Sequence, residues 1–168
     1  MSGTDQELFN LAMSEESRPL MYAVQKHITE NVAPITEEFF ALNDEKEDRW
    51  TWHPRQTELL EGAKAKAKES GLWNFFLPDA ETGQGLNNLD YAYIAAELGK
   101  YSLASETLNC SAPDTGNMEV LERVGTPEQK DKWLTPLLNG EIRSAFAMTE
   151  PGVASSDAKN ISTSAVLK

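Results

Sequence analysis

A stripe of seven apolar residues constrains the fold of this chain more than any other feature. Its members follow one another at intervals of three or four positions, which places them on one face of a helix. They are Leu20, Val24, Ile28, Val32, Ile35, Phe39 and Leu42. Pro34 lies inside the stripe and has no backbone N–H to donate, so we expect the helix to kink there rather than to end. The sequence therefore predicts a long amphipathic helix that must cover a core.

Helical signals continue as far as Gly140. The predicted helices cover residues 54–70, 89–100, 104–110, 114–124 and 127–139. Gly71 and Gly140 stand where two of them should end, because glycine readily adopts the left-handed cap conformation. The run Leu72–Pro78 is densely apolar, and we expect it to be buried beneath the helices.

Two of these helices carry recognisable start signals. Asp114 is expected to cap the helix that follows it. Thr126–Gln129 is a capping box with proline at the first helical position. The helix that begins there should bury four apolar side chains, namely Trp133, Leu134, Leu137 and Leu138.

The periodicity changes at Glu141. Side chains alternate from Ile142 to Met148 and again from Ile161 to Leu167, which predicts two strands. The expected fold class is mainly α, with a helical bundle over residues 17–140 that follows a loose segment, 1–16. Residues 141–168 would be the beginning of an incomplete β domain. Two strands do not make an independent sheet, so we expect a fragment or partner strands from elsewhere.

Composition excludes several classes of function. The formal net charge is −12, which repels nucleic acid and anionic membrane surfaces. The single cysteine, Cys110, cannot form an intrachain disulfide, and we expect it to be a packed residue rather than a nucleophile. The sequence shows no pattern typical of a signal peptide or a membrane span. The expected location is therefore the cytoplasm, or the mitochondrial matrix or peroxisome in a eukaryote.

Motifs for other kinds of chemistry are missing from the sequence. No GxGxxG follows a strand, and there is no GxSxG nucleophile elbow. His27, His53 and Cys110 do not have metal-ligand spacing, so no metal site is predicted. Hydrolase and metalloenzyme interpretations are therefore weak.

The segment after the first predicted strand is rich in hydroxyl groups. Thr149 stands at the end of the strand, Pro151-Gly152 bends the chain, and Ser155 and Ser156 follow. Such a turn can hold a pyrophosphate through backbone N–H dipoles without cationic side chains. The alternative is a plain turn in which Ser and Asp bond their own backbone, and spacing alone favours that alternative.

Several motifs resemble the acyl-CoA dehydrogenase family over nearly the whole chain beyond residue 17. Phe146-Ala147-Met148-Thr149-Glu150-Pro151 and Ser156-Asp157 resemble its aromatic-x-x-Thr-Glu-Pro and Ser-Asp segments. Gly125–Leu137 resembles the preceding helix, and Leu77–Leu86 resembles a family loop. Asn109–Met118 is similar to the subgroup typified by family members 10 and 11. The chain has one residue more between Thr149 and Asp157 than the common family pattern, a trait which that subgroup shares.

The resemblance implies roles for individual residues. Phe146 and Met148 would contact the flavin of FAD through backbone atoms, and the Thr149 hydroxyl would bond the pyrimidine edge of the flavin. Ser155 and Ser156 would face the pyrophosphate, with Ser156 also near the acyl-CoA; either serine could take the role of the family serine. Glu150 is not expected to be the catalytic base, because that glutamate lies on a later helix in the family. No catalytic residue is assigned within the chain.

The implied activity is α,β-dehydrogenation of an acyl-CoA thioester, as in fatty-acid β-oxidation. A full-length form would be a homodimer or homotetramer and could pass electrons to electron-transferring flavoprotein. The 168-residue chain alone should neither hold FAD firmly nor turn over substrate. Two alternatives stay open: a non-catalytic helical interaction module, or an acyl-CoA oxidase-like enzyme that uses oxygen.

Overall fold

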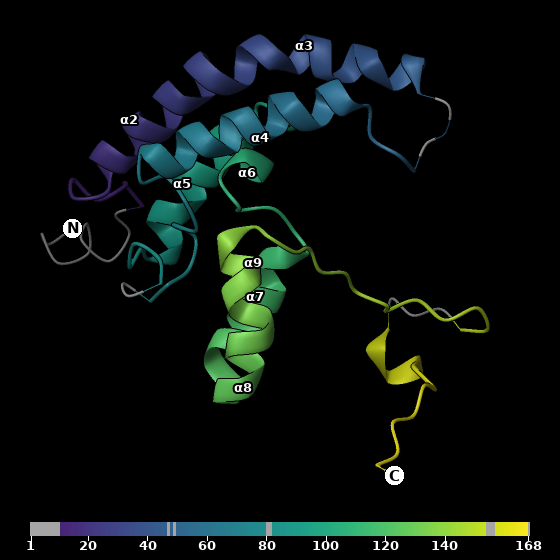
Figure 1. Ribbon diagram of the computed structural model, residues 1–168. Helices are drawn as coiled ribbons and strands as arrows, with labels where there is room; N and C mark the ends of the chain where they lie inside the picture. The colour runs from purple at the N-terminus through teal and green to yellow at the C-terminus, as the bar shows by residue number, and fades with distance from the viewer. Residues whose placement is uncertain (1–10, 47, 49, 80–81, 154–156, 168) are drawn as a thin grey trace, which may run out of the picture.

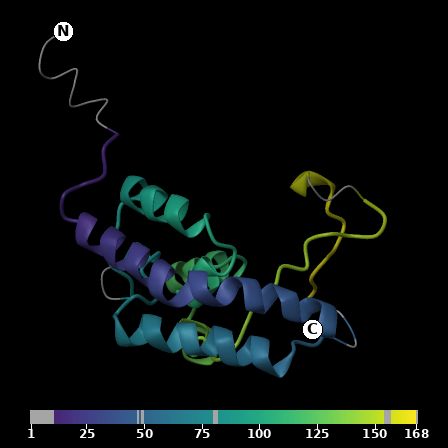
Figure 2. The same cartoon turned by 90° about the horizontal axis from the view of Figure 1, so that it is seen from above.

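The computed structural model describes residues 11–46, 48, 50–79, 82–153 and 157–167, and the regular structure within them is entirely helical. A long rod formed by α2 and α3 lies alongside α4, with α5 and α6 next to them and a second group of helices below (Figure 1). Seen from above, α4 and α5 lie on opposite sides of the rod (Figure 2). The helices are α2 (Arg18–His27), α3 (Ala33–Ala41), α4 (Pro54–Glu69), α5 (Asn88–Leu98), α6 (Ala104–Thr107), α7 (Asp114–Val124), α8 (Pro127–Gln129) and α9 (Thr135–Asn139).

The rod is one continuous helix with a wide turn in its middle. The π-helical segment η1 (Ile28–Val32) joins α2 to α3. Apolar residues spaced by four drift around an α-helix by about 40° per step, because 3.6 residues make a turn. The wider π turn offsets that drift. Val24, Ile28 and Val32 are consequently all buried, with at most 5% of each exposed.

Proline follows such a wide turn twice among the described residues. Pro34 comes two residues after η1, and Pro136 comes two residues after a second π-helical segment, η3 (Lys130–Leu134). A proline cannot donate to the carbonyl four residues earlier and clashes with it in a regular α-helix. In both places the preceding turn is wide and the helix continues. The expectation that Pro34 would not end its helix is confirmed.

Side-chain caps position α4. His53 Nδ1 accepts a hydrogen bond from the Arg55 N–H at 3.1 Å, and Gln56 Oε1 accepts one from the His53 N–H at 3.1 Å. The buried Gln56 amide also donates to the Phe39 carbonyl at 2.8 Å, which ties α4 to the end of the rod. At the other end, Gly71 has φ +69°, as the sequence predicted.

The apolar run after α4 lies in the core, as expected. Leu72, Phe75, Phe76 and Leu77 are buried. Polar side chains near this run donate hydrogen bonds to the C-terminal end of α9, whose last carbonyls have no partner within the helix. Trp73 Nε1 and Asn74 Nδ2 donate to the Leu138 carbonyl at 2.7 and 2.8 Å, and Lys68 Nζ donates to the Asn139 carbonyl at 2.7 Å.

Two local predictions for the last helices are wrong. Trp133 is 47% exposed, with Lys132 Nζ 4.7 Å from its ring centroid, whereas Leu134 and Leu137 are buried as expected. Trp133 lies within η3, where the wide turn changes the phase of the helix. Asp114 does not cap its helix: Pro113 holds that position, and the Asp114 carboxylate bonds residues further along the chain.

The two predicted strands are also wrong for the part of the chain that the structure describes. Residues 143–150 and 161–167 have no regular structure; between them lie a turn at 151–152 and the short 3-10 helix η4 (Ala158–Asn160). Alternation of side chains indicates an extended backbone, but a strand also needs a partner for its N–H and C=O groups. Residues 143–149 make no backbone ladder with any described segment.

The segment ahead of α2 is tied to α5. The buried carboxylate of Asp90 accepts hydrogen bonds from the Ser14 N–H at 2.8 Å, the Ser14 hydroxyl at 2.7 Å and the Ser17 hydroxyl at 2.9 Å. These bonds hold the pKa of Asp90 below its ordinary value, the backbone bond from Ser14 having the largest effect. No helix among the described residues is long and apolar enough to cross a bilayer.

Candidate functional site

The segment predicted to contact the cofactor leaves the helices after α9. In Figure 1 it extends away from α7 and α9 as the yellow-green part of the trace. Phe146 is 63% exposed, Met148 is 58% exposed, and Thr149 is exposed. Ser155 and Ser156 lie outside the described residues. The three described candidate residues are therefore exposed rather than packed into the core.

A buried carboxylate on α7 holds the beginning of this segment. Asp114 is 2% exposed. Its Oδ1 accepts hydrogen bonds from the Ser144 N–H at 2.7 Å and the Ser144 hydroxyl at 2.5 Å, and its Oδ2 accepts one from Arg143 Nε at 2.5 Å. Burial opposes ionisation of Asp114, but the bonds from Ser144 and Arg143 outweigh it and hold the pKa of this carboxyl below its ordinary value.

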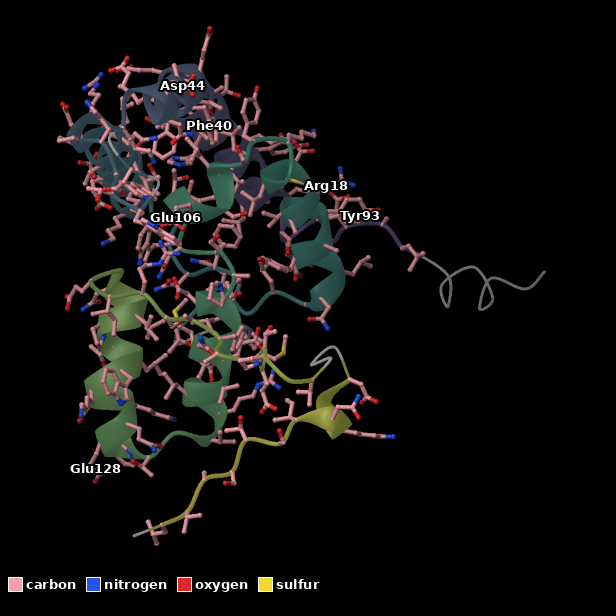
Figure 3. The ribbon with its side chains drawn as sticks, turned by 90° about the vertical axis from the view of Figure 1, so that its right-hand side faces the viewer. Arg18, Phe40, Asp44, Tyr93, Glu106 and Glu128 are labelled. Carbon is pink, nitrogen blue, oxygen red and sulfur yellow. The ribbon has the colours of Figure 1, made fainter. Side chains whose placement is uncertain are left out.

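The charge of Arg143 is shared with a second carboxylate. Arg143 Nη1 lies 2.6 Å from Glu106 Oε1, and Lys64 Nζ lies 3.1 Å from the same oxygen. The network thus pairs two carboxylates, on α6 and α7, with two cations, on α4 and on the segment itself. Figure 3 shows Glu106 where the two groups of helices meet. Because each of these two carboxylates has a cationic partner, its burial leaves no isolated charge.

Two further contacts join the segment to α7. Asn117 Nδ2 donates a hydrogen bond to the Ser144 hydroxyl at 2.8 Å. A methyl group placed on Gly116 would lie 3.7 Å from Phe146 Cζ, so the phenyl ring lies beside this glycine. The first turns of α7 therefore form a platform for residues 143–146.

Glu150 is occupied by a different interaction. Its carboxylate accepts hydrogen bonds from the Ser162 N–H at 3.0 Å, from the Ser162 hydroxyl at 2.8 Å and from the backbone and hydroxyl of Thr163. The bonds from Thr163 and Ser162 lower the pKa of Glu150 to about 2. A carboxylate with so low a pKa is a weak base at neutral pH. In this structure Glu150 acts as a hydrogen-bond acceptor for Ser162 and Thr163.

Asp157 behaves as the structural alternative anticipated. Its Oδ1 accepts a hydrogen bond from the Lys159 N–H at 3.0 Å, which begins the short helix η4. This part of the segment therefore includes a turn in which an Asp side chain bonds its own backbone. That bond does not involve Thr149, Phe146 or Met148.

Cys110 and His27 are both buried in the helical core. Cys110 is buried, and burial raises the pKa of its thiol to about 12, so it is a packed residue as predicted. His27 is buried with Nε2 3.0 Å from Thr107 Oγ1, and burial lowers the pKa of its imidazole. No group of three or more His, Cys, Asp or Glu able to hold a metal ion occurs among the described residues.

A small cavity lies between α5 and α7. Its volume is about 160 Å³, below the range of about 300–1,000 Å³ that is usual for complete ligand pockets. Burial raises the pKa of Tyr91 in its wall to about 12, so the phenol is neutral. The lining residues are Phe76, Pro78, Leu86, Asn88, Tyr91, Thr115, Glu119 and Arg123.

The sequence did not indicate the network around Asp114. Arg143 and Ser144 are 29 and 30 residues from Asp114, and Glu106 is 37 residues from Arg143, so no local pattern joins them. One signal was available: Arg143 is a charged residue at the beginning of an alternating apolar segment. A charge in such a place needs a partner.

Comparison with known proteins identifies the class to which this helical fold and its segment belong. Residues 14–141 match the family model described as "Acyl-CoA dehydrogenase, N-terminal domain". The chain belongs to the acyl-CoA dehydrogenase family. The resemblance inferred from the Thr-Glu-Pro segment and the helix before it is thereby confirmed.

Several individual relatives are similar over most of the chain. It is 48% identical to mouse acyl-CoA dehydrogenase family member 10, over 90% of this chain and 14% of that protein. It is 46% identical to chicken family member 11, over 96% of this chain and 20% of that protein. A solved structure of a putative acyl-CoA dehydrogenase from Mycobacterium abscessus is 47% identical with a TM-score of 0.79, covering 88% of this chain and 37% of that one. The chain thus spans 14–20% of these curated relatives and 37% of the solved chain.

Proposed function

We propose that the chain supplies one wall of the FAD site of an acyl-CoA dehydrogenase that acts on an acyl-CoA thioester. The observation that carries the proposal is the segment from Arg143 to Thr149, which is attached to α7 through Ser144 and is exposed from Phe146 to Thr149, at the edge of a helical domain of this family. Residues 17–140 would be that helical domain, and residues 141–168 would begin the next one.

The described part of the segment fits a flavin. Backbone groups of residues 145–149 make no hydrogen bond to any described backbone group, so they remain available to a ligand. Phe146 and Met148 would bind through these groups, and the exposed Thr149 hydroxyl can both donate and accept at a ring edge. Ser155 and Ser156 would face the pyrophosphate, and Ser156 would also lie near the acyl-CoA.

The chain's own residues bind and orient rather than carry out bond cleavage. FAD, when bound, supplies the acceptor for the hydrogen removed as hydride from the substrate. The base that removes the α-proton would come from another part of the enzyme, because Glu150 is engaged with Ser162 and Thr163. The proposed electron acceptor is electron-transferring flavoprotein, and the proposed assembly is a homodimer or homotetramer.

A chimera tests this function. The chain would replace the matching residues of the Mycobacterium abscessus relative, and Thr149→Val would be compared with Thr57→Val, an exposed threonine on α4. Both changes replace a hydroxyl by a methyl group. We expect Thr149→Val to weaken FAD binding by about tenfold, as for loss of one hydrogen bond of roughly 1–1.5 kcal/mol. Equal FAD affinity in the two variants would contradict the proposed role of Thr149.

The same chimera separates the proposed reaction from its alternatives. Reduction of an electron-transferring flavoprotein by acyl-CoA would support a dehydrogenase. Substrate-dependent consumption of oxygen would favour the oxidase alternative. A chimera that folds with FAD but oxidises no acyl-CoA, while the parent relative does, would contradict the proposed activity.

A further inference from the structure

Three residues form a connection between the helical domain and the candidate cofactor segment. Asp114, Arg143 and Ser144, which we call the Asp114 clamp, join the first turn of α7 to the chain two residues before Phe146. Both carboxylate oxygens are used: Oδ1 accepts from the N–H and hydroxyl of Ser144, and Oδ2 accepts from Arg143 Nε. A backbone N–H fixes the register of the chain, which a side-chain contact alone does not.

The surroundings of the clamp limit its movement. Only 3% of the Asp114 side chain is exposed, and Glu106, which holds the other end of the Arg143 guanidinium, is 16% exposed. Lys64 on α4 pairs with the same Glu106 oxygen, so α4, α6 and α7 all contribute to the position of Arg143. Figure 3 shows Glu106 at this junction. Bonds between charged groups at a half-buried site are stronger than bonds between neutral groups.

The Asp114 clamp lies directly before the residues proposed to contact the flavin. Thr149 is five residues after Ser144, and Phe146 lies beside Gly116, one turn or less from Asp114 on α7. Residues 145–149 have no ladder partner among the described residues, so the clamp and the contact at Gly116 set where they begin and in which direction they run.

We propose that Asp114 is a positioning residue that sets the register of Phe146, Met148 and Thr149 for binding FAD. This proposal rests on the proposed function, because it concerns the same segment. In this proposal Asp114 touches neither the cofactor nor the substrate, because its carboxylate acts through Ser144 and Arg143. A displaced segment would offer the same groups at the wrong positions.

Two substitutions at Asp114 test the mechanical part of the proposal in the 168-residue chain. Asp114→Ala removes both acceptors, whereas Asp114→Asn keeps one oxygen for the Ser144 N–H. We expect exchange of the Ser144 amide, measured by NMR, to be about tenfold or more faster in Asp114→Ala and intermediate in Asp114→Asn. Glu119→Gln, which removes a charge on the same helix away from the segment, should leave the Ser144 rate unchanged.

Unchanged exchange of Ser144 in a folded Asp114→Ala chain would overturn the proposal. If circular dichroism shows that Asp114→Ala loses its helices, Ser144→Ala decides instead, since Ser144 lies outside every helix. That variant loses only the hydroxyl bonds to Asp114 and Asn117. We expect a several-fold faster exchange at residue 144 with intact helices, and no change would overturn the clamp.

An FAD titration tests the positioning part. In the unmodified chain, FAD at millimolar concentration should shift the amide signals of Phe146, Met148 and Thr149. The apparent dissociation constant should rise about tenfold in Asp114→Ala and recover in part in Asp114→Asn, measured at a temperature where circular dichroism shows all three chains to be folded. Equal constants in all three chains would overturn the positioning role.

The titration also tests the proposed function separately. If FAD shifts none of these signals in any chain, the proposed flavin contact fails, and the positioning role fails with it. The exchange of the Ser144 amide still shows whether the clamp exists.

Discussion

His27 is a buried imidazole whose two nitrogen atoms have different partners. Thr107 donates its hydroxyl proton to the Ala104 carbonyl at 2.8 Å, so it must accept from His27 Nε2–H. His27 Nδ1 then accepts from the Asn31 amide at 3.4 Å, which requires a neutral ring. Burial lowers the pKa of His27 in the folded chain, so the unfolded chain binds a proton first as the pH falls.

The free energy of unfolding should therefore be fully maintained above about pH 6.5 and fall as the pH drops below that value, by at most about 1.4 kcal/mol per pH unit. Urea unfolding at pH 7.5 and pH 5.5 measures the difference, and the same measurement on His27→Gln isolates the part that His27 contributes. His27→Gln can bond both neighbours without titrating and should lose this dependence. An equally steep dependence in His27→Gln would show that another group is responsible.

Two glycines should respond in opposite ways to alanine. A methyl group on Gly83 would lie 2.0 Å from the Leu77 carbonyl oxygen, which is backbone and cannot swing aside, whereas one on Gly62 within α4 would meet nothing within 4 Å. We expect Gly83→Ala to destabilise the chain by about 1–3 kcal/mol. Gly62→Ala should stabilise it by about 0.5–1 kcal/mol because alanine favours the helix. Thermal unfolding of both variants checks the prediction, and a neutral Gly83→Ala would contradict the close approach.

At the level of single residues, sequence reasoning found packing and missed tertiary polar contacts. Cys110 and the apolar stripe were recognisable because burial leaves a local pattern. The partners of Asp114 were not recognisable from the sequence. A carboxylate at the start of a helix resembles a cap whether or not it acts as one. The sequence left both Ser155 and Ser156 as candidates for the family serine, and both lie outside the described residues.

The capping box at Thr126 is an element-scale feature that the sequence predicted and the structure contains. Thr126 Oγ1 accepts from the Gln129 N–H at 3.3 Å, and Gln129 Oε1 accepts from the Thr126 N–H at 2.9 Å. Thr126→Ala should lower stability by about 1 kcal/mol, and Thr126→Ser should restore most of it. Chemical denaturation measures both. Thr57→Ala, at an exposed helix interior, is the control and should not destabilise the chain, so equal losses at the two sites would argue against the cap.

The helices could be predicted because their sequence signals are local. The strands could not, because their pairing depends on residues far away in the sequence. Gly71, Gly140 and the Thr126 box mark helix ends within a few residues of the hydrogen bonds they affect. A strand depends on partners distant in sequence, so the alternation from Ile142 to Met148 indicated an extended chain and nothing more. The exposure of Trp133 has a different origin, because a π-helical turn changes which residues face the core.

At the scale of the whole molecule, a helical domain of the acyl-CoA dehydrogenase family carries an exposed segment that α7 holds at its beginning. That arrangement provides attachment and orientation for a cofactor without enclosing it. The family and the helical architecture followed from the sequence, since both rest on patterns within the chain.

Retention of FAD through gel filtration tests the central claim most directly. We predict that the 168-residue chain, mixed with FAD, elutes without flavin absorbance, because it supplies only one wall of the site. The chimera with the Mycobacterium abscessus relative should elute with equimolar flavin, like the unmodified relative. A colourless chimera beside a yellow relative, or stoichiometric flavin on the chain alone, would contradict the account.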